Sequence, residues 1–158
     1  MRIINKFDYR NAAAILRAKA PEILDETISI LNDAENTLDL SPHGKQRDVS
    51  KQIQKFFVDK GWDKEASHFS VADLKYDLMK NGIPIEIEIG HERLVYAVFF
   101  KFLADFSNEH IPAGILIVTE NPEDFGEPWH NSRIKTKKKI EAISRFFLVP
   151  VLIIGIAP

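Results

Sequence analysis

Asp77 and Glu86 lie on either side of an Asn81-Gly82 dipeptide, and Glu88 follows two residues later. Asn-Gly between two apolar runs is the strongest short signal for a β-hairpin with a two-residue type I′ turn. Such a turn fixes the cross-strand pairs as Lys80–Ile83, Met79–Pro84, Leu78–Ile85 and Asp77–Glu86. The pairs alternate between hydrogen-bonded and non-hydrogen-bonded positions, which puts Asp77 and Glu86 where side chains approach most closely. Glu88 is expected on the same face as Glu86.

Carboxylates placed directly opposite each other destabilise a sheet unless they share a proton or hold a cation. Ligand sets made only of oxygen suit a hard cation such as Mg²⁺, which takes one or two carboxylates together with water and phosphate oxygens. The alternative is a solvated face of an exposed hairpin. The register puts Pro84 where the ladder needs no N–H, and this agreement makes the metal site as well supported as the solvated face. Four isoleucines take the opposite face and are the expected core side: Ile83, Ile85, Ile87 and Ile89.

The composition is that of one globular domain. The chain has 158 residues, of which 45% are hydrophobic and 28% charged, and residues 1–158 are expected to form a single domain. The absence of cysteine excludes disulfides, thiolate zinc sites and cysteine nucleophiles, and it fits a cytoplasmic location. No apolar run reaches the ~18 residues of a membrane span, and the N-terminus lacks a signal-peptide core, so no membrane partner is expected. The sequence also lacks a P-loop, a dinucleotide-binding glycine pattern and a Ser-His-Asp order with a nucleophile elbow.

The formal net charge of −2 gives no global sign of a nucleic-acid partner, but basic residues gather in two stretches. One spans residues 133–145, with Arg133, Lys135, Lys137, Lys138, Lys139 and Arg145. The other spans residues 45–64, with Lys45, Arg47, Lys51, Lys55, Lys60 and Lys64. Such clusters can bind a phosphate backbone even on a neutral protein. The alternative for each is a solvated helix face.

Apolar periodicity and turn signals predict helices mixed with strands. Helices are expected at residues 9–19, 22–36, 47–60, 91–106 and 132–147. Strands are expected at residues 67–72, 75–80, 83–89, 115–118 and 149–154. Helices link the last three strands, which predicts parallel neighbours, whereas the hairpin is antiparallel. The expected fold class is α/β, with a mixed sheet of about five strands flanked by helices on both faces and with helices 9–36 packed on this core.

The order of Asp77, a hairpin turn, Glu86 and Glu88, then an apolar helix and a buried strand, resembles the core of the PD-(D/E)XK nucleases. The gap of nine residues from Asp77 to Glu86 and the Glu-x-Glu pair are similar to the BglII/BamHI branch of type II restriction endonucleases. The similarity covers residues 76–119. It implies a restriction-endonuclease-like core and an Mg²⁺-dependent endodeoxyribonuclease, with Mn²⁺ as a substitute, that hydrolyses phosphodiester bonds in DNA.

The resemblance also implies residue roles. Asp77 and Glu86 match the metal-ligand carboxylates of these enzymes, and the main-chain carbonyl of Ile87 matches a further ligand. Glu88 stands where most of the superfamily has lysine, and it would orient or deprotonate the attacking water. His91 and Arg93 are expected to begin the helix that points toward base edges in these enzymes.

The expected partner is double-stranded DNA. Phosphate contacts are expected from Arg133, Lys135, Lys137, Lys138, Lys45 and Arg47. A homodimer matches the two strands of a duplex, with Tyr96 and Phe100 as candidate interface residues. A cognate DNA methyltransferase in the host is a further implied partner.

Two other interpretations stay open. One is a DNA-binding or interaction protein on a nuclease fold without hydrolysis, although clustered carboxylates near phosphate would not help a pure binder. The other is a structure-specific repair or phage-defence nuclease. Asp48 and Gln52, on the helix expected to flank the site, are candidates for contacting metal-bound water. His43 and His130 lie in polar loops, where a surface position is expected rather than a role as catalytic base.

Overall fold

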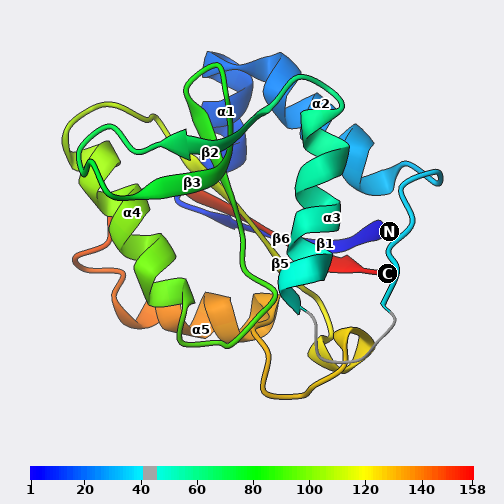
Figure 1. The fold of residues 1–158 in the computed structure, drawn as a ribbon. Coiled ribbons are helices and arrows are strands. Elements are labelled where there is room, and N and C mark those ends of the chain that lie inside the picture. The colour runs from blue at the N-terminus through cyan, green and yellow to red at the C-terminus, as the bar shows by residue number, and fades with distance from the viewer. Residues whose placement is uncertain (41–45) are drawn as a thin grey trace.

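A six-stranded mixed sheet forms the centre of the protein (Figure 1). The computed structural model describes residues 1–40 and 46–158, and of Gln46 and Arg47 only the backbone. The strands are β1 (Arg2–Tyr9), β2 (Asp63–Ser67), β3 (Lys75–Lys80), β4 (Ile83–Ile87), β5 (Gly114–Thr119) and β6 (Val151–Ala157). Their order is β1-β6-β5-β4-β3-β2; the β4–β5 and β5–β6 pairs are parallel, and the other pairs are antiparallel. The predicted mixed sheet and its parallel centre are confirmed.

Helices cover both faces of this sheet, as the sequence predicts. They are α1 (Ala12–Lys19), α2 (Pro21–Asn32), α3 (Gln46–Val58), α4 (Val95–Ser107) and α5 (Arg133–Ala142), with a short 3₁₀ helix, η1 (Pro122–Phe125). One buried cluster joins α1, α2 and α3 to the sheet and includes Ile53 and Ile85. A second cluster lies on the other face and joins α4 and α5 to it through Phe102 and Ile140. Within the described part of the chain, no helix is long and apolar enough to cross a membrane.

The hairpin of β3 and β4 has the predicted turn and register. Asn81 and Gly82 both have positive φ, 50° and 74°, as a type I′ turn requires. The ladder pairs Lys80 with Ile83, Met79 with Pro84 and Leu78 with Ile85. All four alternating isoleucines, Ile83 to Ile89, are buried in the cluster under α1–α3. The local sequence therefore sets which face of β4 carries Glu86 and Glu88.

One strand was not predicted from the sequence, and another lies at a different place from the predicted one. The strand not predicted is β1, an edge strand whose residues are mostly exposed and whose register shifts between Ile3 and Asn5, which breaks the alternating pattern. The strand expected at residues 67–72 lies earlier, at Asp63–Ser67. Residues after it turn, because Asp105 on α4 accepts hydrogen bonds from the backbone N–H groups of Phe69 and Ser70.

Several ends of elements also differ from the predicted positions. Helix α4 begins at Val95 rather than at residue 91, because the backbone of His91 pairs with that of His130 in an isolated β-bridge. Helix α5 begins as predicted, with the side chain of Ser132 accepting a hydrogen bond from Lys135 N, but it ends at Ala142 rather than at residue 147. Helix α2 ends at residue 32, before its predicted end at 36.

Candidate active site

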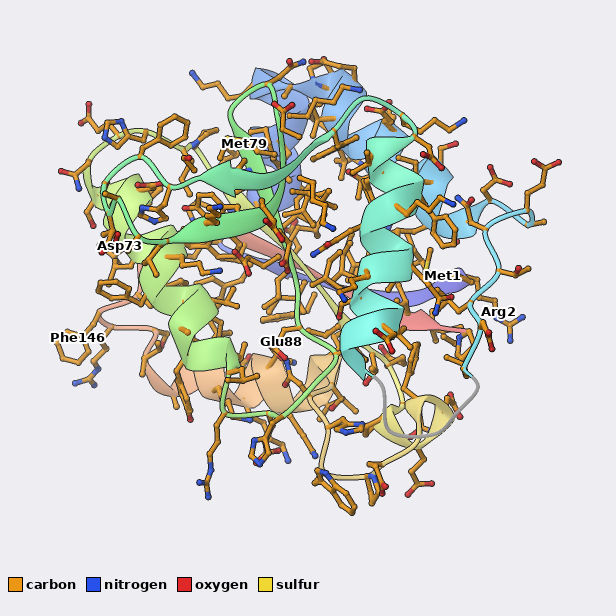
Figure 2. All side chains as sticks on the ribbon, in the orientation of Figure 1. Met1, Arg2, Asp73, Met79, Glu88 and Phe146 are labelled. Carbon is orange, nitrogen blue, oxygen red and sulfur yellow. The ribbon has the colours of Figure 1, made fainter. Side chains whose placement is uncertain are left out.

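A cleft of ≈ 640 Å³ opens between α3 and α4, above the end of β4. Helix α3 contributes Gln54 to its wall, and helix α4 contributes Lys101. Strands β3 and β4 and the residues after them contribute Asp77, Glu86, Ile87, Glu88, Gly90 and His91. Glu88 lies between the two helices, where the chain leaves the sheet (Figure 2). The structure thus brings the three predicted carboxylates into one cleft.

Asp77 reaches the cleft by a different geometry from the predicted one. It does not pair with Glu86, because the β3–β4 ladder stops at Leu78–Ile85. Its Oδ2 instead accepts a hydrogen bond from Ile87 N at 2.8 Å, and its Oδ1 accepts one from Gln54 Nε2 at 3.0 Å. Burial raises the pKa of Asp77, although the hydrogen bond from Ile87 N and the nearby Lys101 oppose this shift. Two donors therefore fix the direction of this carboxylate before any ligand binds.

Glu86 is the most buried of the three carboxyl groups, with 4% of the residue exposed. Its Oε1 accepts a hydrogen bond from Lys101 Nζ at 2.8 Å, and the same ammonium donates to the main-chain oxygen of Lys75 at 2.7 Å. Burial and the charge of Asp77 raise the pKa of Glu86 to about 8, and Lys101 offsets only part of this effect. The group therefore retains its proton easily at neutral pH.

Glu88 follows the last residue of β4, and its backbone is held on two sides. Its N–H donates to the main-chain oxygen of Ile117 at 2.9 Å, and its carbonyl accepts from Asn131 Nδ2 at 3.4 Å. Its Oε1 accepts a hydrogen bond from Gly90 N at 3.1 Å. Burial and the charge of Asp77 raise the pKa of Glu88 to about 7. A carboxyl group with this pKa can take up and release a proton near neutral pH.

These residues fit a hard divalent cation held by few protein ligands. Among the side chains that the structure describes, no three His, Cys, Asp or Glu residues form a ready-made metal cluster. The charge of Asp77 nevertheless raises the pKa of both Glu86 and Glu88, which indicates an excess of negative charge in the cleft. Mg²⁺ typically binds through one or two carboxylates and fills its other positions with water and phosphate oxygens. Asp77, Glu86 and the carbonyl of Ile87 match that pattern better than an all-protein cage.

Gln54 and Lys101 bind the carboxylates of the cleft but were not among the predicted site residues. The helix that carries Gln54 was predicted in the right place, with Asp48 and Gln52 as its candidate residues. Asp48 lies 3.9 Å from Lys51 in an exposed ion pair, and Gln52 makes two hydrogen bonds with the backbone of Asp39. The periodicity of this helix does not by itself distinguish Gln52 from Gln54. The choice depends on which face of the helix is buried, and Gln54 lies beside the core residue Ile53. Lys101 gave no signal, because it lies inside an apolar helix far from the carboxylates in sequence.

The basic cluster on α5 is largely engaged within the protein. Arg133 forms two hydrogen bonds of 2.6 Å with the carboxylate of Glu120, which raises the pKa of the guanidinium. Lys135 Nζ donates to the carbonyls of Pro128 and His130 and pairs with Glu92 at 3.2 Å. These contacts give both side chains a structural use that the sequence analysis did not foresee.

Other predicted DNA contacts keep accessible side chains. Lys137 lies 4.9 Å from the ring of Phe7 but remains partly exposed, and Lys138 is exposed. His91 and Arg93 are both exposed in the turn before α4, and His91 lines the cleft.

Some predicted positions lie outside the described residues, and one, His130, is buried rather than exposed. Lys45 and His43, and the side chain of Arg47, lie outside the described residues. His130 was expected at the surface but is 4% exposed, and its Nδ1 has no hydrogen-bond partner among the described atoms.

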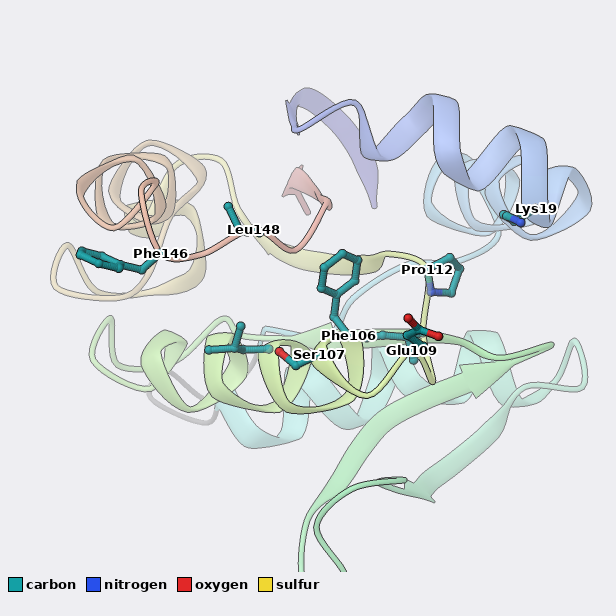
Figure 3. A pocket seen from close by; sticks show the side chains of 9 residues that line it. Lys19, Phe106, Ser107, Glu109, Pro112, Phe146 and Leu148 are labelled. Atoms are coloured by element: carbon teal, nitrogen blue, oxygen red, sulfur yellow. The ribbon is translucent and has the colours of Figure 1, made fainter.

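A second hollow, of ≈ 680 Å³, lies away from the carboxylates (Figure 3). Its walls are largely apolar, with Leu103 and Phe106 from α4 and Phe146 and Leu148 from the segment between α5 and β6. Lys19, Ser107 and Glu109 are the polar side chains among the residues that line it. None of the three predicted carboxylates lines this hollow, so the cleft is the candidate active site.

Comparison with known proteins identifies the same architecture. Residues 4–156 match the family described as restriction endonuclease BglII/BglIII. The crystal structure of restriction endonuclease BglII complexed with a DNA 16-mer has a TM-score of 0.75 to this chain, at 17% identity, over 100% of this chain and 77% of that one. The crystal structure of free BglII has a TM-score of 0.62 at 17% identity, over 100% and 80% of the two chains. No curated protein sequence matches the chain.

Proposed function

The chain belongs to the BglII/BglIII restriction endonuclease family, and from that premise we propose that Asp77, Glu86 and Glu88 form its site of phosphodiester hydrolysis. Membership of this family confirms the predicted resemblance, the fold and the enzyme class, a type II restriction endonuclease that cleaves DNA. The alternative of a binding protein without hydrolysis loses its support. The observation that carries the proposal is the meeting of three carboxyl groups with raised pKa values in one cleft.

The proposed cofactor is Mg²⁺, with Mn²⁺ as a substitute, held by Asp77, Glu86 and the main-chain carbonyl of Ile87. Bound there, it would offset the charge of the phosphodiester and lower the pKa of a coordinated water. The support is the excess of carboxylate charge around a donor set that contains only oxygen. Gln54 assists by holding one oxygen of Asp77, so that the carboxylate does not rotate.

Glu88 is the proposed general base. It would accept a proton from the attacking water as the new P–O bond forms, while the bond to the 3′ oxygen breaks and that oxygen gains a proton from solvent. A base works best when its pKa lies near the working pH, and the pKa of Glu88 is raised to about 7. Its hydrogen bond from Gly90 N keeps the carboxylate at the end of β4.

The proposed substrate is double-stranded DNA, approaching the mouth of the cleft. His91 and Arg93 are the proposed readers of base edges, and the exposed Lys138 is a proposed phosphate contact. Lys45 and Arg47 keep their predicted role as phosphate contacts. We leave Arg133 and Lys135 out of the DNA-contacting set, because their side chains bind groups of the protein.

The proposed active form is a homodimer, because a twofold pair of chains places one site on each DNA strand. Tyr96, Phe100 and Leu103 lie along one face of α4 and are 53%, 55% and 36% exposed. Phe146, which extends outward at the edge of the molecule, is 83% exposed and lines the apolar hollow together with Leu103 (Figure 2). Monomeric proteins rarely expose so continuous an apolar surface, and this surface is the proposed interface.

Three further proposals concern the domain organisation, the location of the enzyme and a partner enzyme. Residues 1–158 act as one nuclease domain, with α1 and α2 packed on the sheet. The enzyme works in the cytoplasm. A cognate DNA methyltransferase in the host protects the recognition sequence from it.

Plasmid cleavage with Mg²⁺ tests the proposed site. Asp77→Ala and Glu86→Ala should each abolish cleavage and also Mn²⁺ binding by titration calorimetry. Asp73→Ala is the matched control, because Asp73 is exposed in the turn before β3 and lies outside the cleft. Discrete fragments from the wild type would support sequence-specific cleavage, and a smear would argue for cleavage without it. Equal Mn²⁺ binding by wild type and Asp77→Ala would refute the site.

A further inference from the structure

Among the described side chains that line the carboxylate cleft, Lys101 is the cation that contacts a carboxylate of the proposed site. Its side chain extends from the middle of α4 to β4 and is 19% exposed. The ammonium donates to Glu86 Oε1 at 2.8 Å and to the main-chain oxygen of Lys75 at 2.7 Å. A lysine ammonium has three donors, so these contacts leave one for another acceptor. Lys101 also lowers the proton affinity of Asp77 and Glu88, so its charge acts on the whole cluster.

The backbone of Lys101 is fixed, whereas its charged end can change partner. His68 Nε2 lies 2.9 Å from the carbonyl oxygen of Lys101, and the hydroxyl of Tyr76 lies 3.2 Å from the same oxygen. Tyr76 also donates to the buried Asp105 at 3.0 Å, which anchors α4 one turn further along. The flexible four-carbon stem of a lysine lets its ammonium move between acceptors without movement of the helix.

The charge of the expected complex requires such a cation. A phosphodiester brings a negative charge into a cleft that is already lined by four carboxyl groups, those of Glu65, Asp77, Glu86 and Glu88. Lys51 and Lys64 also line the cleft, but both are exposed at its rim, and Lys51 pairs with Asp48. Lys101 alone among these three contacts a catalytic carboxylate. A charge inside a partly desolvated site acts more strongly than one at the rim.

We propose that Lys101 is a catalytic residue that changes partner during the reaction, from Glu86 in the free enzyme to a non-bridging oxygen of the scissile phosphate. Glu86 is one of the residues that would hold a divalent cation, so in the metal-bound enzyme the ammonium of Lys101 would be free to bind the phosphate. This inference rests on the proposed function of the cleft. It follows that Lys101 weakens metal binding in the absence of DNA, while it strengthens binding of the scissile phosphate and speeds cleavage.

The test compares Lys101→Met, which keeps the apolar stem, with Lys101→Arg, which keeps the charge. Lys6→Met, on the exposed strand β1, is the control. Titration calorimetry without DNA should show Mn²⁺ binding to Lys101→Met about 3- to 10-fold more tightly than to the wild type, because a competing cation is gone. Duplex binding in Ca²⁺ should weaken about 10-fold, and single-turnover cleavage should slow about 100-fold. Lys101→Arg should fall between wild type and Lys101→Met in all three measurements.

Mn²⁺ binding and DNA cleavage, measured together, distinguish the proposed role of Lys101 from a purely structural one. A lysine needed only for folding would not bind metal more tightly once removed, so unchanged or weaker Mn²⁺ binding by a folded Lys101→Met overturns the proposal. Cleavage within twofold of wild type also overturns it. If Lys101→Met fails to fold, Lys101→Gln provides the same comparison. Glu86→Gln identifies the other failure: if it still binds Mn²⁺ and cleaves DNA, the proposed active site itself is wrong.

Discussion

The carboxylate of Asp77 accepts a hydrogen bond from Ile87 N at 2.8 Å, and this contact joins the ends of β3 and β4 where their ladder has already stopped. The β3–β4 ladder stops at the pair Leu78–Ile85, so Asp77 and Glu86, the proposed metal ligands, are not paired on it. The other oxygen of this carboxylate, Asp77 Oδ1, accepts a hydrogen bond from the side chain of Gln54 on α3. Three separate elements therefore set the position of one carboxylate.

Gln54→Met should slow cleavage about 10-fold, because Asp77 loses the donor that fixes one of its oxygens. The fold should persist, since Met fills a similar volume beside the core residue Ile53. Gln52→Met is the matched control, because Gln52 makes its hydrogen bonds with the backbone of Asp39 and lies outside the cleft. Single-turnover cleavage of one duplex by both variants measures the difference. Equal slowing by the two substitutions would refute a specific role for Gln54.

The stability of the metal-free protein should fall as the pH rises from about 4.5 to about 8. Burial raises the pKa of Glu86 from 4.5 to about 8 and that of Glu88 from 4.5 to about 7. Within this window the folded protein holds protons that the unfolded chain has already lost, so each step up in pH favours unfolding. Below the window both states are protonated, and above it both are ionised, so the contribution of these groups levels off.

Thermal melts with a chelator, from pH 5 to pH 9, measure this slope. Glu86→Gln should be more stable than wild type at pH 8 and should show a smaller decline, because glutamine cannot ionise. Mn²⁺ should bind more tightly as pH rises through the same window, since a ligand carboxyl group must lose its proton. Parallel slopes for wild type and Glu86→Gln would mean that other groups cause the pH dependence.

The hairpin shows how far local sequence predicts this site. Asn81-Gly82 determines the turn, and the turn determines three cross-strand pairs and the face that carries Glu86 and Glu88. The position of Asp77 could not be predicted in this way, because its partners come from α3 and from beyond the ladder. The Asp77–Glu86 pair was predicted by continuing the register outward from the turn, and tertiary contacts end the ladder before that pair.

Lys101 and β1 were missed for different physical reasons. A lysine side chain spans several ångströms, so its role depends on the strand that the helix packs against rather than on its neighbours in sequence. Strand β1 lies at an edge with one shifted register, and so its pattern is neither alternating nor apolar. The apolar strands β5 and β6 were predicted well, because both of their faces are buried.

Asn131→Ala should destabilise the protein by about 2–4 kcal/mol, because it removes two buried hydrogen bonds and leaves a small cavity. Asn131 is fully buried; its Nδ2 donates to the carbonyl of Glu88, and its Oδ1 accepts from Thr136 Oγ1 at 3.0 Å. Denaturant unfolding measures the change. Asn108→Ala, at the exposed position that follows the C-terminal end of α4, should cost under about 1 kcal/mol. A similar loss in both variants would show that Asn131 does not specifically hold the end of β4.

The basic side chains should divide into two classes when DNA binding is measured against salt. Lys138→Ala should weaken binding to every duplex and reduce the salt slope by about 0.9 log units, because an exposed lysine loses one phosphate contact. Lys135→Ala should lower the melting temperature and leave that slope unchanged, because its ammonium binds the carbonyls of Pro128 and His130.

Arg93→Ala should change the preference between matched and mismatched duplexes by about 1–3 kcal/mol if its guanidinium reads a base edge. A salt series on both duplexes separates the three outcomes. A reduced slope in Lys135→Ala would show that DNA binding releases this lysine from its contacts within the protein, and an unchanged preference in Arg93→Ala would place sequence recognition elsewhere on the molecule.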